Sequence, residues 1–254
     1  MTLDPSRVRA GFWRRWFALL IDGLIISVPF QLIVAILFAA TSGRIQQFAG
    51  VTYASCALLE NIPDGIVLAP PPPAGSNFAR ECSVYFFGAQ TGRNLQVGRV
   101  TRDGASTKTI WRSYMLDRDG QPVDGVTVDW IVMVVFIVYL FAFEARTGAS
   151  LGDRATRIVV VDTLSPADAS IPLRKIIVRY LVMLIGLVPM LGATLVFLGP
   201  FGPDIDELAD SAYFTWLWAT GVFAIGWGLY LSIAIIRKRD PLYDKIAGTA
   251  VVRV

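Results

Sequence analysis

The segment WFALLIDGLIISVPFQLIVAILFAA (residues 16–40) decides the fold class of this chain. It is long enough to cross a bilayer as one helix, and Asp22 is its only ionisable group. A carboxylate near the middle of a membrane helix costs roughly 2.5–3.5 kcal/mol, so it is seldom placed there without a partner. Arg14 and Arg15 stand about two helical turns before it. The sequence therefore predicts a membrane protein with a buried ionic feature.

The composition agrees with this prediction. Of the 254 residues, 54% are hydrophobic and 17% are charged, with a mean hydropathy of +0.55. Soluble domains carry about a quarter charged residues. The net charge is +3, but the basic residues cluster beside apolar runs, which indicates anchoring at a membrane rather than nucleic-acid binding. The chain has no histidine, which excludes His-based triads and His zinc ligands, and we expect neither enzymatic activity nor a cofactor.

Four apolar runs are long enough for a membrane helix of about 17–25 residues. They are residues 16–40, 126–143, 176–199 and 212–236. The segments before the first run, between the second and third, and after the fourth are rich in lysine and arginine. The loop between the third and fourth runs has neither and carries Asp204, Asp206, Glu207 and Asp210. This distribution predicts that both termini are cytoplasmic.

The first run could instead be a cleaved signal peptide. Its apolar core, however, is far longer than the usual length of about 7–15 residues, and Asp22 would interrupt it. We therefore interpret the run as a retained transmembrane helix, with residues 1–40 as the first segment of the chain.

Residues 41–125 form an external insert, and residues 126–254 hold the remaining helices with a cytoplasmic loop and tail. Both cysteines, Cys56 and Cys82, lie in the insert, which predicts a disulfide on the oxidising side of the membrane; two unpaired thiols are the alternative. After Cys82, the segments SVYFF, LQVGRV and TKTIWRSYML resemble strands, with turns expected at 91–94 and 102–106. The insert is therefore predicted to be a small β-meander.

Two short β-branched segments on the cytoplasmic side, residues 157–162 and 248–254, do not continue any membrane run. Each alone would leave its backbone amides unpaired, so we predict that they pair, with Val160 near Val251. This pairing would bring Asp244 towards Arg154 and Arg157.

Three blocks of the sequence resemble the RDD family of bacterial membrane proteins: GFWRRWFALLIDGLII (11–26), EARTGASLGDRATRIVVVD (144–162) and DPLYDKIAGTAVVR (240–253). The family is named for one arginine and two aspartates, which by motif match are Arg15, Asp22 and Asp244. The chain departs from the family pattern at Asp153, where a lysine is usual, and at Tyr243, where a histidine is usual. The resemblance implies a bacterial inner-membrane protein, and for some members transport of unidentified ligands or cation/proton antiport.

The candidate ligand or ion site is centred on Asp22, for which we expect a cationic partner: Arg179 first, then Arg15. It is either a carboxylate that binds a cation or proton, or a charge pair that fixes helix packing. Glu144 and Arg154 flank a glycine-rich turn that either contacts an anion or lipid headgroup or only anchors the chain. With Asp244, the candidate residues are Asp22, Arg15, Arg179, Glu144, Asp244 and Arg154; the sequence indicates no particular metal.

The sequence therefore predicts an all-α membrane protein with four transmembrane helices, a small disulfide-containing β-rich external insert and a short cytoplasmic strand pair. The first hypothesis for its function is transport of a small cation or proton through the Asp/Arg site. The alternative is a non-catalytic accessory or scaffolding subunit whose insert binds a partner. The expected partners are the bilayer with its anionic lipids and either further copies of the chain or another membrane protein.

Overall fold

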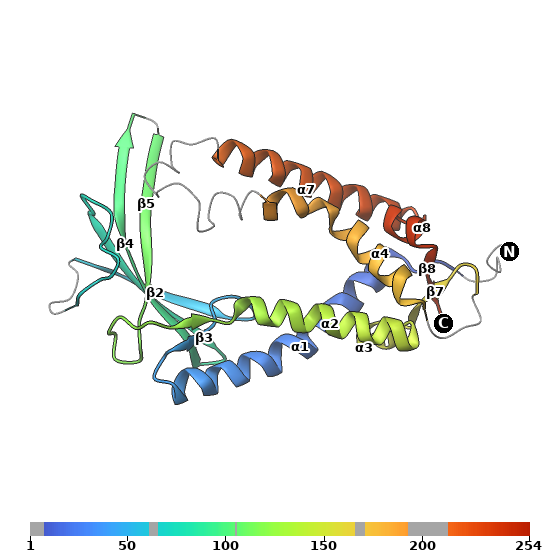
Figure 1. Ribbon diagram of the computed structural model, residues 1–254, viewed down its shortest axis with the longest axis horizontal. Helices are drawn as coiled ribbons and strands as arrows, with labels where there is room; N and C mark the ends of the chain where they lie inside the picture. The colour runs from blue at the N-terminus through green and yellow to red at the C-terminus, as the bar shows by residue number, and fades with distance from the viewer. Residues whose placement is uncertain (1–7, 61–65, 105, 166–170, 193–212) are drawn as a thin grey trace. The chain divides into compact units, whose positions relative to one another are not determined.

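The computed structural model describes residues 8–60, 66–104, 106–165, 171–192 and 213–254 (Figure 1). The chain forms two compact units, one of residues 1–24 with 136–254 and one of residues 25–135. The boundaries between the two units fall within the long helices α1 (Phe12–Ala40) and α2 (Asp129–Thr147), so each helix contributes residues to both units.

Three helices in the described part of the chain are long and apolar enough to cross a membrane. They are α1 (Phe12–Ala40), α2 (Asp129–Thr147) and the stretch Thr215–Ile236 within α7 (Tyr213–Ile236). The prediction of an all-α protein with four transmembrane helices was wrong. The chain is 47% helical and 26% strand, and it contains a four-stranded antiparallel sheet.

The third apolar run is not one continuous helix. It begins as α4 (Leu173–Met183), tightens into the 3₁₀ turn η1 (Leu184–Gly186), and is helical again up to residue 192. Pro189 has no N–H for the carbonyl four residues earlier, which lies in η1, so a break at this point follows from the sequence. Gly186 also allows close packing, since a Cβ there would lie 2.6 Å from the Trp227 ring. Residues 193–199 of the expected span lie outside the described residues.

The predicted pairing of the two short β-branched segments is confirmed. Strands β7 (Ile158–Asp162) and β8 (Thr249–Arg253) are antiparallel, with Val160 directly opposite Val251. The segment before α1 adds to the other edge of β8, because the Ala10 amide donates to the Val251 carbonyl at 3.0 Å. These strands therefore tie both ends of the described chain to the segment between α2 and α4.

An ion pair joins β7 to α4. The Lys175 ammonium lies 2.6 Å from a carboxylate oxygen of Asp162, which also accepts from the Leu164 amide at 2.8 Å. Burial alone would raise the pKa of Asp162, but the hydrogen bonds and charge of Lys175 and the backbone amides outweigh it, so the pKa lies below its ordinary value.

We expect this ion pair to make the free energy of unfolding depend on pH in the acidic range. Because the folded-state pKa of Asp162 is below the unfolded value of about 4, its contribution is present above that value and lost as the pH falls through the folded-state pKa. Thermal unfolding of the protein in nanodiscs at a series of acidic pH values measures this loss, and Asp162→Asn should flatten the curve. An unchanged acid slope in the variant would contradict the assignment.

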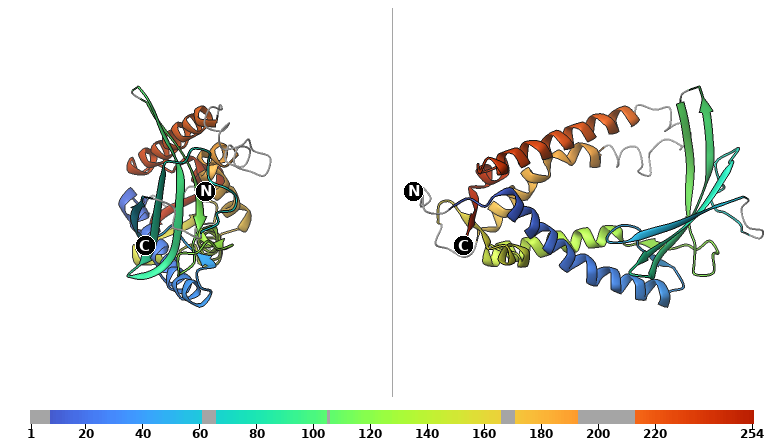
Figure 2. Two further views of the ribbon diagram at one scale, coloured as in Figure 1. Left: turned by 90° about the vertical axis from the view of Figure 1, so that its left-hand side faces the viewer. Right: turned by 180° about the vertical axis from the view of Figure 1, so that it is seen from behind.

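The unit of residues 25–135, which includes the predicted external insert, contains a sheet of four strands. In order across the sheet they are β2 (Tyr53–Leu59), β3 (Phe78–Phe86), β4 (Ala89–Asp103) and β5 (Ser106–Met115). Its strong twist is plain when the molecule is turned (Figure 2). Residues alternate across it, and Leu95, Val97 and Tyr114 are in its buried cluster. Two further short strands pair in parallel: β1 (Ile45–Gln46) precedes the sheet along the chain, and β6 (Val126–Thr127) follows it.

The predicted β-rich insert is present, but one of its expected turns was misplaced. Residues 91–94 continue β4, and the turn between β3 and β4 lies at Phe87 and Gly88. Gly92 does not mark a turn; a Cβ there would lie 2.9 Å from the Phe48 ring, so glycine makes room for an aromatic side chain. The turn expected at 102–106 is found between β4 and β5.

The predicted disulfide between Cys56 and Cys82 is confirmed, and it joins directly opposed residues of β2 and β3. Replacing both cysteines with serine should destabilise these strands by about 2 kcal/mol, because the bridge closes a loop whose entropy would then be released. Hydrogen exchange of the full-length protein, followed by mass spectrometry, should show roughly 30-fold faster exchange in β2 and β3. The β7–β8 amides, in the other unit, are the internal control; equal exchange in both proteins would contradict the prediction.

Candidate functional site

Asp22 is buried in α1, with 2% of its surface exposed, and its carboxylate accepts three hydrogen bonds. The donors are the Tyr139 hydroxyl at 2.7 Å, the Ser150 hydroxyl at 2.5 Å and the Gly152 amide at 2.7 Å. Tyr139 comes from α2, and the other two from the start of α3 (Leu151–Ala155). We call these four residues the aspartate latch, because they fasten α1 to the α2–α3 segment.

The sequence SLGD (150–153) positions the latch. Ser150 caps α3: its hydroxyl accepts from the Asp153 amide, and the Asp153 carboxylate accepts from the Ser150 amide, each at 3.0 Å. Gly152 sits against α1 so closely that a Cβ would meet the Ala18 carbonyl and lie 2.8 Å from the Asp22 carboxylate. Only glycine leaves room for this contact.

The expected direct pairing of Asp22 with Arg179 or Arg15 was wrong. Among the described residues, neither arginine forms a salt bridge with Asp22; both pair with other carboxylates. Hydroxyl and amide donors at the start of a helix stabilise a carboxylate without a full positive charge. The signal that could have revealed them is the capping box at Ser150 and Asp153, which lies within the segment interpreted only as a glycine-rich turn.

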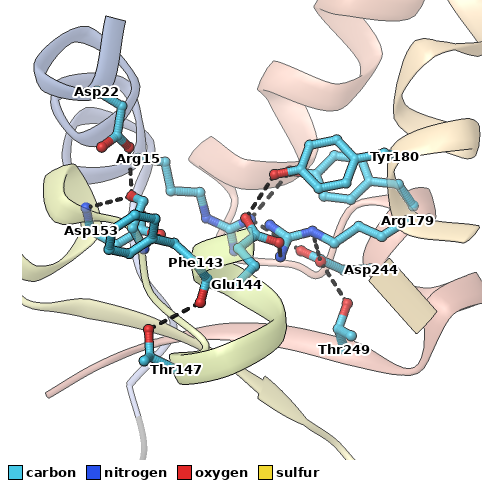
Figure 3. A network of polar contacts seen from close by, with 12 residues as sticks. Arg15, Asp22, Phe143, Glu144, Thr147, Asp153, Arg179, Tyr180, Asp244 and Thr249 are labelled. Carbon is cyan, nitrogen blue, oxygen red and sulfur yellow. Dashed lines mark hydrogen bonds and ion pairs between the residues drawn. The ribbon is translucent and has the colours of Figure 1, made fainter. Parts of the chain in front are cut away.

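Four other charged residues of the same unit form a chain of ion pairs (Figure 3). The carboxylate of Asp244 lies 3.1 Å from Arg15 and 3.3 Å from Arg179, and Arg179 lies 3.1 Å from Glu144. All four side chains are nearly or fully buried. We call this set the four-charge network; it contains two cations and two anions and therefore balances itself.

Neighbouring hydroxyls complete the network. Tyr180 donates to Glu144 at 2.9 Å, and Thr249 donates to Asp244 at 2.9 Å. The guanidinium of Arg179 also lies over the Tyr243 ring, 5.6 Å from its centroid. Asp244 and Tyr243 belong to α8 (Leu242–Ala247), so the network joins the N-terminal helix, α2, α4 and the C-terminal segment.

The latch and the network border one cavity of about 230 Å³. Its polar lining includes Asp22, Asp153 and Glu144 together with Arg15 and Arg179, and the rest of the lining is mainly apolar. With Asp244, four carboxylates face two guanidinium groups, so the arginines do not balance Asp22 and Asp153. Burial raises the pKa of Asp153, and the charge of Asp22 raises it further, against the lowering by the Ser150 hydrogen bonds and Arg179.

Arg154 is not part of this cluster. It is exposed, donates to the Thr147 hydroxyl at 2.9 Å and lies 5.9 Å from the centroid of the Phe143 ring. The expected approach of Asp244 to Arg154 and Arg157 is replaced by its pairing with Arg15 and Arg179. In the described part of the chain, no group of three or more Asp, Glu, Cys or His side chains is placed to hold a metal ion.

The apolar helices and the buried ionic cluster define an integral membrane protein whose first helix is fastened to its C-terminal segment by charge. The sequence model of the RDD family matches residues 84–248, which is 165 of the 254 residues, and the chain belongs to this family. The match includes part of the insert formed by residues 41–125 and does not reach Arg15 or Asp22. No curated protein and no solved structure matched the chain significantly.

Proposed function

We propose that this protein carries a proton or a small monovalent cation across the membrane, and that Asp153 and Asp22 hold it. The observation that carries the proposal is the excess of carboxylates at the cavity. Asp22 and Asp153 line the same cavity as Glu144 and Arg179, but among the described residues neither Asp22 nor Asp153 forms a salt bridge. Two carboxylates that share a site repel each other, and a bound proton or cation removes that cost.

Ser150 couples the two carboxylates. Its amide donates to Asp153 and its hydroxyl donates to Asp22, so a change of charge on one is felt by the other. Asp153 is the group that we expect to take up the proton, because its pKa is raised. Asp22, which is held by three donors, is the fixed member of the pair.

The test is ion flux into proteoliposomes that contain the purified protein and a trapped pH-sensitive dye. The wild-type protein should collapse an imposed pH gradient, and Asp153→Asn should abolish this activity while the protein stays folded. Asp119→Asn, which removes an exposed carboxylate in the unit of residues 25–135, is the matched control and should leave flux unchanged. Flux that persists in Asp153→Asn would contradict the proposed role of that residue.

A non-catalytic accessory role is the second candidate, and it is favoured by β2. This strand forms one edge of the external sheet, and residues 53–58 are all exposed, on both of its faces. An edge of this kind can accept a strand from a partner. A well-folded wild-type protein without flux for protons, sodium or potassium would favour this role over transport.

We further propose that the protein lies in a bacterial inner membrane with both termini in the cytoplasm, works without enzymatic activity, and functions with further copies of the chain or another membrane protein and with anionic lipids. The support for the orientation is the lysine and arginine distribution. Single cysteines at Thr107 and Thr163 test it in whole cells, since the described chain has no free thiol. An impermeant reagent should label the first only; the reverse would overturn the orientation.

A further inference from the structure

An exposed apolar tip lies at one end of the external sheet. Phe87, in the turn between β3 and β4, is 83% exposed, and Val51 and Tyr53 beside it are also exposed. The three residues line one shallow hollow of about 280 Å³. We call Val51, Tyr53 and Phe87 the aromatic tip; in water this surface would be unfavourable.

The backbone of the tip makes the presence of phenylalanine more unusual. Phe87 and Gly88 both have positive φ, at 46° and 89°, in a two-residue turn between the paired residues Phe86 and Ala89. Turns of this type favour asparagine, aspartate or glycine, and a bulky side chain with positive φ is an outlier. The residue at this position is therefore best explained by what the side chain touches, not by what the turn requires.

The tip is held at the level of the membrane helix ends. Two residues after the start of β4, the Thr91 carbonyl accepts from the Gln47 amide at 2.9 Å. Asp129, the first residue of α2, accepts from the amides of Phe48 and Ala49 at 3.0 and 2.7 Å. The sheet is thus fixed to the loop that follows α1 and to the start of α2, all within the unit of residues 25–135.

The chain then folds back along α1 before it reaches the tip. Gln31, which is fully buried, donates to the Ala49 carbonyl at 3.4 Å, and Gly50 packs directly against the Gln31 side chain. Gln31 lies nine residues before the end of α1 at Ala40, or about 13 Å along the helix axis. Val51 and Tyr53 follow directly after Gly50, so they lie near Gln31 rather than beyond the C-terminal end of α1. The neighbouring residues Leu32, Ile33 and Ile36 of α1 are exposed.

We propose that the aromatic tip enters the bilayer interface of the leaflet that holds the C-terminal end of α1, as an anchor for the external sheet. The C-terminal half of α1 exposes Leu32, Ile33 and Ile36, as a helix in contact with lipid would. Aromatic side chains favour the boundary between headgroups and acyl chains. Tyr53 stacks on Tyr85, with ring centroids 5.4 Å apart, so that the apolar surface is preformed. This proposal does not depend on transport by the protein.

The experiment places a fluorescent label on Ala89→Cys in the full-length protein, reconstituted into phosphatidylcholine–phosphatidylglycerol nanodiscs. Ala89 is exposed and adjoins the turn, and the two native cysteines are bonded to each other. A lipid with a nitroxide near the top of its acyl chain should quench this label, and aqueous iodide should not. The same label at Thr107, at the other end of the sheet, should show the opposite pattern.

Substitutions at Phe87 distinguish insertion of its side chain into lipid from a sheet that only lies close to the membrane. Phe87→Asn suits the turn and should keep the sheet folded, yet the lipid quenching of the Ala89 label should be lost; Phe87→Trp should retain it. A label that is open to iodide in the wild-type background would overturn the proposal. A label that is shielded from iodide without lipid quenching would also overturn it, because the tip would then contact a protein, either a second copy or a partner.

Discussion

Replacing Arg179 with glutamine should lower the free energy of unfolding by about 3–5 kcal/mol, the cost of breaking a buried pair by removing one partner. Arg179 contacts both Glu144 and Asp244, so its loss leaves two buried carboxylates with Arg15 as the remaining cation of the network. Unfolding by heat or denaturant in nanodiscs measures the change. Arg154→Gln is the matched control, because that arginine is exposed, and its effect should stay within about 0.5 kcal/mol.

A second substitution shows whether the loss is electrostatic. Arg179→Gln combined with Glu144→Gln removes one charge of each sign, leaves Arg15 opposite Asp244, and should recover part of the stability lost in the single variant. If the double variant is as unstable as the sum of the two single variants, then packing of the side chains, rather than charge balance, holds this region together.

Contacts between segments with few candidate partners were predictable from this sequence, and contacts with several candidate partners were not. The disulfide follows from the presence of two cysteines in one segment, and the β7–β8 pairing follows from two short β-branched segments that continue no membrane run. The pairing of Arg15 with Asp244 joins residues 229 positions apart, and nothing in the local sequence distinguishes this arginine–aspartate pair from the Arg15–Asp22 or Arg179–Asp22 pairs that we expected. The sequence shows which residues are charged, but tertiary packing determines which of them pair.

Wrong predictions arose where one residue type serves two structural purposes. Glycine marks turns, but Gly92 lies within β4 to make room for Phe48, and Gly152 lies in α3 to admit Asp22. Strand β2, with the sequence YASCALL, has no clean apolar–polar alternation because it is exposed on both faces at a sheet edge. The long apolar run at 176–199 satisfied the length for a span, whereas Pro189 and Gly186 divide its described residues.

The aspartate latch gives the second large effect. Gly152→Ala should destabilise the protein by about 3–5 kcal/mol, because overpacking alone costs about 1–3 kcal/mol and the hydrogen bonds to the Asp22 carboxylate would be broken as well. The added methyl group meets the Ala18 carbonyl and the Asp22 carboxylate, and a backbone carbonyl of α1 cannot move aside without a shift of the helix. Gly23→Ala is the matched control, since nothing lies within 4 Å of a Cβ there; it should be neutral or slightly stabilising.

Asp22→Asn completes the argument, because it changes the charge of the latch without adding bulk. Asparagine presents an amide donor to a site whose three contacts are themselves donors, so we expect a loss of about 1.5–3 kcal/mol. The effects of Asp22→Asn and Gly152→Ala should not add, since both break the same hydrogen bond between the Gly152 amide and Asp22. Strict additivity in unfolding experiments would mean that the carboxylate and the glycine act separately, and that Asp22 is not what fastens α1 to α3.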